Sequence, residues 1–412
     1  MFNWLKIASG NIWKNKRRSL VTILAVAFGF AAVSLFRGYM NNIYDSLRNS
    51  AIRGEGLGHL TLYKKGWLLE GKLDPDKYMF TKGEMDTITA LLENDRDVVL
   101  VTPQLRIAGL ASNGRVSTIF IASGVIPSDE LVIKGSWATS RPVIGEPLSE
   151  KNAYGVEMAQ DLAAILNLKP GDDGVVMATT PDGQMNALDI HVSGVFDSGS
   201  ESTNDKFMRV PFSFAQSLYD TDKADRLVIL LDDWQKTEAA RLRLQTILED
   251  AGLECEIKTW NELSAFYTKV KGMFGMIFMF IFTIVFVVIT MSVVNTMGMT
   301  VLERTREIGA LRAIGVKRSG ISSLFAIEGA LLGFMGTVGG VVLNIIVWFG
   351  VRMADIRYVP PGRSSEVSLI VNLLPLVMVK LTLFMVLLSL LAAIIPARRA
   401  ARLKVVDALG HV

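Results

Sequence analysis

Four long stretches of the chain are almost free of charged residues: 19–36, 272–302, 321–351 and 373–395. The first two carry no charge at all, and only Glu328 and Lys380 interrupt the other two. A helix needs about 20 apolar residues to cross a bilayer, because lipid offers its backbone no hydrogen-bond partners. The pattern therefore predicts four transmembrane helices over these ranges, rather than the buried helices of a large soluble core.

Between the first two apolar stretches, residues 37–271 carry a different pattern. Short apolar or alternating runs bounded by Gly, Pro and Asp predict strands in 97–110, 115–125, 188–196 and 226–233. Helical spacing occurs in 84–94 and 236–252, and Gly252 is a candidate C-cap for the second. The order strand, helix, strand over Arg226 to Trp260 predicts a split βαβ unit. Residues 37–52 and 259–271 are expected to form helical stalks that continue the membrane helices. The predicted fold class is an α-helical membrane domain with a large mixed α+β domain between its first and second helices.

Basic residues predict which side of the membrane each segment faces. The chain is 50% hydrophobic and only 20% charged, and its charges are unevenly placed. The N-terminal segment 1–18, the loop 303–320 and the tail 396–412 together hold fourteen Lys and Arg but three Asp and Glu. Because cytoplasmic loops carry the excess of Lys and Arg, these three segments are expected in the cytoplasm. Both termini then lie inside, and the domain 37–271 and the short loop 352–372 lie outside.

The first apolar stretch raises the question of a cleaved signal peptide. Basic residues precede it, and Ala25-Val26-Ala27 mimics a cleavage site. The apolar run continues to Phe36, well past that triplet, which favours an uncleaved signal-anchor helix.

Residues that could carry catalysis are sparse. The three histidines, His59, His191 and His411, lie far apart in the sequence. The single cysteine, Cys255, alternates with apolar residues, which predicts a buried core thiol. There is no HExxH, CxxC or GxSxG motif and no GxxxxGK(S/T) phosphate loop. We therefore predict no catalytic residue, cofactor, metal site or nucleic-acid partner for this chain.

Two features of the third apolar stretch point to packing or transport. Charges inside a membrane often mark ion or proton paths, so Glu328 is either transport-active or structural, bonded to a hydroxyl or to a cytoplasmic Arg. Four glycines at spacings of 4, 3 and 4 form one stripe along this helix and predict close approach of another helix: Gly329, Gly333, Gly336 and Gly340. The stripe does not tell whether that helix belongs to the same chain.

One loop is unusually charged. Residues 301–320, VLERTREIGALRAIGVKRSG, hold seven charges between the second and third apolar stretches. The longer segment ERTREIGALRAIGVKRSGISSLFAIEGALLGFMG resembles the C-terminal signature of the FtsX-like/MacB-like permeases of ABC transporters. NIWKNKRRSLVTILAVAFG resembles that family's entry into the membrane, and PARRAARLKVVDALG its closing tail. MAQDLAAILNLKPGD, DIHVSGVFDSG and FMRVPFSFAQSLY are more loosely similar to the family's external domain.

The resemblance implies a coupling helix in this loop. In the family, a short helix between the second and third membrane helices docks on a separate ABC ATPase, and residues 303–317 match that motif. At spacings of three residues, Ile308, Leu311 and Ile314 are expected to present an apolar ridge to the ATPase. The remaining residues assigned to this coupling site are a polar rim and a glycine after it: Glu303, Arg304, Arg306, Glu307, Arg312 and Gly315.

The resemblance also implies an assembly. Two permease chains, as a homodimer or a heterodimer, would work with two ATPase subunits among the lipids of the inner membrane. ATP and Mg²⁺ would bind on the ATPases and not on this chain. The stalks would carry the motion of the coupling helices to the outer domains.

Lipoprotein-releasing permeases are the closest in layout, with four helices, a similar length and no fused ATPase. GEGLGHLTLYKKG, just after the first stalk, is similar to a segment of that group. The resemblance thus implies extraction or release of lipoprotein or lipid-like cargo from the outer leaflet. Export of drugs or peptides with a periplasmic adaptor is an alternative. A signalling permease that activates a cell-wall hydrolase is another, disfavoured by the size of the external domain, and an intramembrane enzyme is disfavoured by the absence of a catalytic constellation.

Overall fold

A computed structural model describes residues 8, 10–13, 16–71, 73–135, 142–199, 201–360 and 366–402. Of the charges that predict the orientation, Lys6, Lys14, Lys404 and Asp407 lie outside these residues. The chain divides into two compact units. We call residues 1–43, 271–357 and 368–412 the helical unit, and residues 44–270 and 358–367 the α/β unit.

Within the described residues, four helices are long and apolar enough to cross a membrane. They are α2 (Lys16–Asn49), α12 (Ala265–Glu303), α14 (Arg318–Ala354) and α15 (Pro375–Ala401). All four are longer than the apolar stretches that predict them, because polar flanking turns continue the helices. Helix α15 begins at Pro375, two residues after the predicted start, since proline is favoured in the first turn. A two-stranded ribbon, β11 (Arg357–Tyr358) with β12 (Val367–Ser368), lies between α14 and α15 in the sequence.

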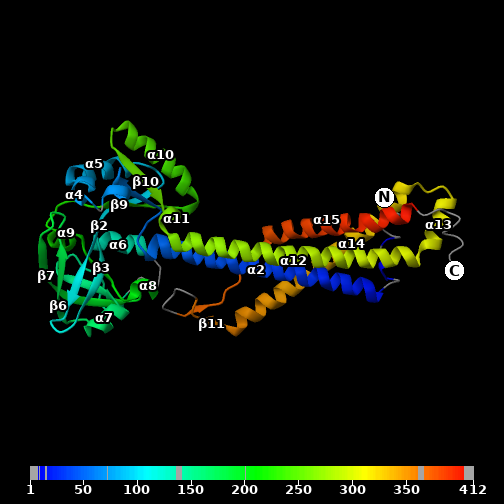
Figure 1. Cartoon of the computed structure of the whole chain (residues 1–412), viewed down its shortest axis with the longest axis horizontal. Helices are drawn as coiled ribbons and strands as arrows, with labels where there is room; N and C mark the ends of the chain where they lie inside the picture. Colours follow the sequence, from blue (N-terminus) through cyan, green and yellow to red (C-terminus); the bar gives the residue numbers. More distant parts are fainter. Residues whose placement is uncertain are drawn as a thin grey trace. The chain divides into compact units, whose positions relative to one another are not determined.

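Helices α2 and α12 run antiparallel and side by side (Figure 1). The hydroxyl oxygens of Thr22 and Thr296 lie 2.6 Å apart, and Ser292 Oγ lies 3.4 Å from Thr22 Oγ1. Further along the pair, a β-carbon on Gly29 would lie 2.8 Å from Val285 Cγ1, so only glycine permits the approach. Small residues and interhelical hydroxyl bonds are the contacts that hold helices together where lipid is as apolar as leucine.

The α/β unit is built on a ten-stranded sheet with the strand order β10-β1-β9-β2-β3-β8-β5-β7-β4, in which β6 pairs with β2 and β7. The strands are β1 (Leu60–Lys64), β2 (Val98–Ser112), β3 (Ser117–Val125), β4 (Pro142–Gly145), β5 (Gly155–Ala159), β6 (Asp173–Thr179), β7 (Met185–Phe196), β8 (Phe207–Pro211), β9 (Arg226–Leu231) and β10 (Cys255–Thr259). The helices are α3 (Trp67–Glu70), α4 (Pro75–Tyr78), α5 (Lys82–Leu92), α6 (Pro127–Lys134), α7 (Gln160–Leu166), α8 (Glu201–Asn204), α9 (Phe212–Tyr219), α10 (Thr237–Asp250) and α11 (Trp260–Leu263), with single turns η1 (Ser50–Gly54) and η3 (Trp234–Lys236).

Strand β2 joins two hydrophobic cores. Its first half pairs with β9, as in Val101 with Ile229, and its second half pairs with β3, as in Gly109 with Phe120. The first core packs α5 and α10 against the sheet, and the second packs α7 and α9 against it. The mixed α and β composition predicted for this region is confirmed.

Strand β1 lies between β9 and β10 and is antiparallel to both. Strands β9 and β10 are therefore parallel, and α10 connects them, which confirms the predicted split βαβ unit. At the end of α10, Gly252 has φ +72°, and Leu253 N–H donates to Leu248 O at 2.9 Å. The predicted glycine cap is thus confirmed as the left-handed residue of a Schellman motif.

The predicted stalks differ from each other. Helix α2 continues through Asn49 into η1, as the apolar spacing predicts. The segment 259–271 is not one helix, because Ser264 with ψ 86° separates the single turn α11 from the start of α12.

Cys255, on β10, is 8% exposed, and burial raises the pKa of its thiol to about 11. The prediction that it is buried is confirmed.

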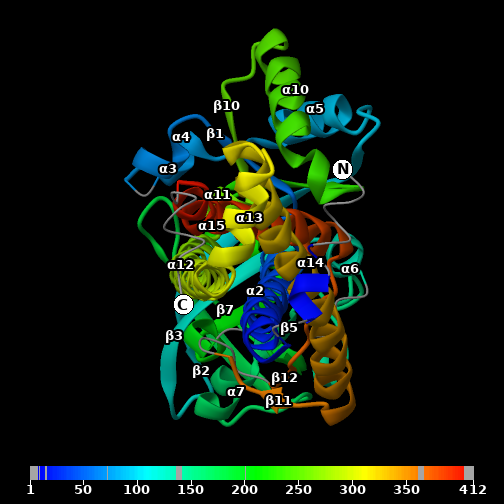
Figure 2. The ribbon, with the colours of Figure 1, turned by 90° about the vertical axis from the view of Figure 1, so that its right-hand side faces the viewer.

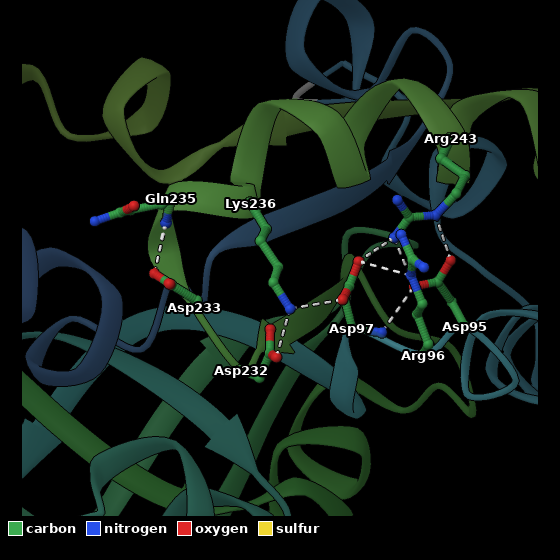
Figure 3. Close-up of polar contacts among 8 residues, drawn as sticks. All are labelled: Asp95, Arg96, Asp97, Asp232, Asp233, Gln235, Lys236 and Arg243. Atoms are coloured by element: carbon green, nitrogen blue, oxygen red, sulfur yellow. Dashed lines mark hydrogen bonds and ion pairs between the residues drawn. The ribbon is translucent and has the colours of Figure 1, made fainter.

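An ion-pair network fixes η3 and α10 to the start of β2 (Figure 3). Arg243 donates to Asp95 Oδ2 at 2.6 Å and to Asp97 Oδ2 at 2.8 Å. Lys236 donates to Asp97 at 2.8 Å and to Asp232 at 2.7 Å. The hydrogen bond from Arg243 holds the pKa of the Asp95 carboxyl below its usual range. The network orders the connection between the two strands of the βαβ unit.

Candidate functional site

The charged loop between α12 and α14 contains a short helix, α13 (Thr305–Ala313), close to the start of α14 (Figure 2). Arg304 leaves the helical region with φ −107° and ψ 17°, so the chain turns between α12 and α13. Thr305 stabilises this turn, because its hydroxyl donates to the carbonyl of Leu302 at 2.9 Å. The coupling-site prediction requires a helix in this loop. Helix α13 meets that requirement, but it is shorter than the predicted range 303–317.

The predicted apolar ridge does not form. Ile308 is 3% exposed and packs in the hydrophobic core of the helical unit, whereas Ile314 is 79% exposed. Leu311 is half-buried against the same core. At about 100° per residue, positions six apart on a helix differ by roughly 120° in direction, so Ile308 and Ile314 cannot share a face. The inner face of α13 packs against the hydrophobic core of the helical unit of the same chain.

Gly315 serves the geometry of the loop. It follows α13 with φ +98°, its N–H donates to Arg312 O at 3.1 Å, and Val316 N–H donates to Leu311 O at 3.0 Å. These two bonds make a Schellman motif, whose left-handed position favours glycine. Val316 and Leu311 both pack against the helical core, the apolar contact that accompanies this motif. Gly315 therefore sets the direction in which the chain enters α14.

Charged residues tie the loop to the helices on either side. Arg304 donates to Glu307 at 2.8 Å and lies 3.5 Å from the carboxylate of Glu328, which is 3% exposed. Arg18 at the start of α2 forms an ion pair with Glu303 at the end of α12. Glu328 is thus placed against a loop Arg, one of the two structural partners considered for it from sequence. The Arg304 contacts join α13 to α14, and the Arg18–Glu303 pair joins the start of α2 to the end of α12.

The remaining rim residues lie in two settings. Arg312 is half-buried, and its Nε atom has no hydrogen-bond partner among the described residues. The exposed residues of α13 and the residue after it share one side, which we call the outer face of α13: Arg306, Glu307, Ala310, Ala313 and Ile314. The coupling-site residues therefore separate into an inner set that anchors α13 and an outer set that solvent reaches.

The glycine stripe on α14 packs against two different helices of the same chain. A β-carbon on Gly329 would collide with Ala393 of α15, and one on Gly333 would lie 2.6 Å from Ser389 Oγ. Gly340 faces α2 instead, where a β-carbon would lie 2.8 Å from Phe30 Cβ. Gly336 also faces α2. The stripe brings α14 into backbone contact with α15 at one end and α2 at the other.

Sequence reasoning missed the residues that complete these contacts. From sequence, Arg18 figures only in the charge cluster before the first apolar stretch, and Thr22 and Thr296 are not singled out. Their signal was present, since hydroxyl residues within a membrane helix tend to face another helix. Their pairing could not be read from the sequence, because the partners are more than 270 positions apart.

Among the described residues, no group of three or more His, Cys, Asp or Glu is placed to hold a metal ion.

Comparisons with known proteins agree with this architecture. The model of the MacB-like periplasmic core domain matches residues 19–247, and that of the FtsX-like permease C-terminal region matches residues 279–405. The chain is 23% identical to the lipoprotein-releasing system transmembrane protein LolC of Xylella fastidiosa, with 100% of each chain covered. It is 24% identical to the macrolide export ATP-binding/permease protein MacB of Campylobacter jejuni, covering 99% of this chain and 61% of that protein.

Among solved structures, the periplasmic region of MacB from Actinobacillus actinomycetemcomitans aligns at 16% identity with a TM-score of 0.37, covering 52% of this chain and 93% of that one. The first of the two family models spans more than half of this chain, and the second begins within α12 and covers α13, α14 and α15. The chain belongs to the FtsX-like/MacB-like permeases of ABC transporters.

Proposed function

We propose that this permease works with a separate ABC ATPase, which docks on the outer face of α13. The observation that carries the proposal is the two-sided character of that helix. Its inner face is fixed in the helical core by Ile308 and by the Arg304–Glu328 pair, while Arg306 and Ile314 are exposed. A force applied to the outer face must therefore move α14 and α12 with it, since packed helices shift as units.

The relatives support a separate ATPase. The LolC relative matches over its full length and is named as a transmembrane protein alone. The MacB relative is named as an ATP-binding/permease protein, and this chain matches 61% of it. In our proposal ATP and Mg²⁺ bind on two partner ATPases, and a second permease chain, identical or homologous, completes the assembly.

Our proposed topology follows the basic residues. Loop 303–320 and both termini face the cytoplasm, and the α/β unit lies outside the inner membrane, as the excess of Lys and Arg favours. In this orientation ATP-driven movement of α13 passes along α12 and α2, which leave the helical unit and enter the α/β unit as continuous helices.

For the cargo, we propose a lipoprotein or lipid-like molecule taken from the outer leaflet. The full-length match to a lipoprotein-releasing protein supports this assignment. The match to a macrolide exporter supports a second candidate, export of a drug or peptide with a periplasmic adaptor. Identification of the molecule that co-purifies with the full complex in mild detergent distinguishes the two, since an acylated protein and a small soluble compound differ in mass and extraction.

Co-purification tests ATPase docking. The tagged full chain should capture an ABC ATPase from membranes, and Ile314→Asp should lose it, because central apolar anchors carry most of the energy of an interface. Leu69→Asp, an equally exposed leucine on α3 of the α/β unit, is the matched control and should capture the ATPase normally. Undiminished capture by Ile314→Asp would place the docking surface elsewhere.

A further inference from the structure

Three helices of the helical unit enclose a groove of about 220 Å³. Its lining comes from α2, α12 and α15 and is apolar except for two cations, Arg37 and Lys380. Arg37 directly follows the uncharged stretch 19–36, and Lys380 is the one charged residue within the stretch 373–395. A charged side chain beside apolar surface in a membrane segment is costly and calls for a partner or a route to water.

Helical spacing explains why these side chains meet. Lys380 and Leu381 are adjacent on α15, and each lies about one turn from Phe384, so the three side chains line the same groove. On α12, Phe278 and Phe282 stack with ring centroids 6.0 Å apart, and Phe282 lies 5.2 Å from the ring of Phe384. The result is a row of aromatic rings beside two cations, a surface with one apolar part and one strongly basic part.

The two cations lack an anionic partner among the residues that the structure describes. Neither Arg37 nor Lys380 forms an ion pair or a side-chain hydrogen bond with any residue that the structure describes. Two positive charges at one groove repel each other unless an anion lies between them. Charge complementarity therefore favours an occupant with a negative head, and the aromatic row favours one with an apolar tail.

The groove lies away from the coupling loop. Arg37 follows the predicted membrane stretch 19–36 on α2, and Lys380 lies near the first turn of α15. The opposite end of α15 packs with Ile308 in the core beneath α13. Given the topology of the proposed function, on which this step rests, the groove opens to the outer leaflet. An anionic phospholipid of that leaflet combines a negatively charged head with apolar tails.

We propose that this groove binds an anionic glycerophospholipid. Its phosphate lies between Arg37 and Lys380, where the guanidinium supplies directed hydrogen bonds and the ammonium a point charge. A segment of one acyl chain lies along Phe278, Phe282 and Phe384. The site is distinct from the outer face of α13, and it holds a lipid of the membrane itself rather than the transported cargo.

Native mass spectrometry of the full chain in detergent tests the site, with dioleoylphosphatidylglycerol and dioleoylphosphatidylcholine as probes. The wild-type chain should retain one phosphatidylglycerol under conditions that remove phosphatidylcholine. The double variant Arg37→Gln/Lys380→Gln should bind phosphatidylglycerol roughly thirtyfold more weakly, from the contribution of two basic residues to anionic-lipid binding. Arg352→Gln removes a cation that lies over the ring of Trp348 on α14, outside the groove, and should bind as wild type does.

Two further variants separate lipid recognition from loss of folding. Lys380→Gln alone changes an exposed side chain and should give an intermediate affinity, while Arg37→Lys keeps the charge and should stay near wild type. Equal retention of both probes by wild type, unchanged binding by the double variant, or a second copy of the chain cross-linked through the groove would each overturn the proposal. ATPase capture, measured on the same samples, reports separately on the proposed function.

Discussion

A β-carbon on Gly336 of α14 would lie 2.5 Å from Cβ of Val26 on α2, so the two helices touch there through their backbones. Val26 is fully buried and belongs to the hydrophobic core of the helical unit. Because both atoms belong to rigid parts of the chain, neither can move aside without shifting a helix. The glycine stripe is therefore a packing device within one chain.

The first prediction uses this contact. Gly336→Ala should destabilise the helical unit by about 1–3 kcal/mol, as overpacking of a closed contact does. Gly350→Ala on the same helix has open space and should be neutral or slightly stabilising, because alanine favours helix more than glycine. Thermal unfolding of the full chain in detergent measures both. Equal melting temperatures for the two variants would show that α2 and α14 do not pack as described.

The second prediction concerns the turn after α13. Gly315→Ala should cost about 1–2 kcal/mol, because φ +98° disfavours any residue with a β-carbon even though space is free there. Gly298→Ala, in α12 and also in open space, is the matched control and should not lower the melting temperature. A Gly315→Ala variant that melts with the control would contradict the assigned Schellman motif.

The third prediction is a pH dependence from His59. This imidazole is 5% exposed, and its Nδ1 accepts a hydrogen bond from Leu231 N–H at 2.9 Å, so the neutral form is required. Burial, assisted by the charge of Arg53, lowers the pKa of His59 to about 4 from 6.5. Between pH 4 and pH 6.5, His59 is protonated in the unfolded chain but neutral in the folded chain. The stability contributed by neutral His59 is therefore present above pH 6.5 and is lost as pH falls toward 4, by about 3 kcal/mol.

Melting temperatures of the full chain between pH 7.5 and 4 measure this effect. His59→Gln should flatten the profile, because an amide oxygen can accept from Leu231 without binding a proton. If His59→Gln keeps the wild-type slope, other groups determine the acid sensitivity.

The fourth prediction concerns topology. Single cysteines at Ser319 and Ser128, both exposed, should label oppositely with an impermeant thiol reagent in a Cys255→Ser background. The basic residues of loop 303–320 place Ser319 in the cytoplasm, whereas Ser128 lies in the α/β unit. Labelling of position 319 from outside intact cells would reverse the proposed orientation.

Elements governed by local periodicity were predictable. The long helices follow from apolar runs, and the split βαβ unit follows from strand and helix spacing between Arg226 and Trp260. The left-handed Gly252 follows from its position after a periodic segment. In each case the relevant interaction joins residues within a few positions of each other, so the sequence order carries the information.

Relationships between distant segments were not predictable. Glu328 pairs with Arg304, 24 positions away in the turn between α12 and α13, and Gly336 meets Val26 across more than 300 positions. The error over the apolar ridge has another cause. Three apolar residues at intervals of three look like one face, yet the angular drift on a real helix turns the third away, and α13 ends before Ile314.

In the proposed mechanism, α13 docks an ATPase with one face and moves the helical unit with the other. ATP hydrolysis by the reconstituted complex, measured against ATPase concentration, separates these two roles. Ile314→Asp should raise the half-saturating ATPase concentration at least tenfold, as expected for loss of an apolar anchor. Ile308→Ala, which leaves the outer face intact, should saturate at the wild-type concentration but reach a lower maximal rate, because the cavity loosens α13 from the core. Saturation of Ile314→Asp at the wild-type concentration with a wild-type maximal rate would contradict the claim.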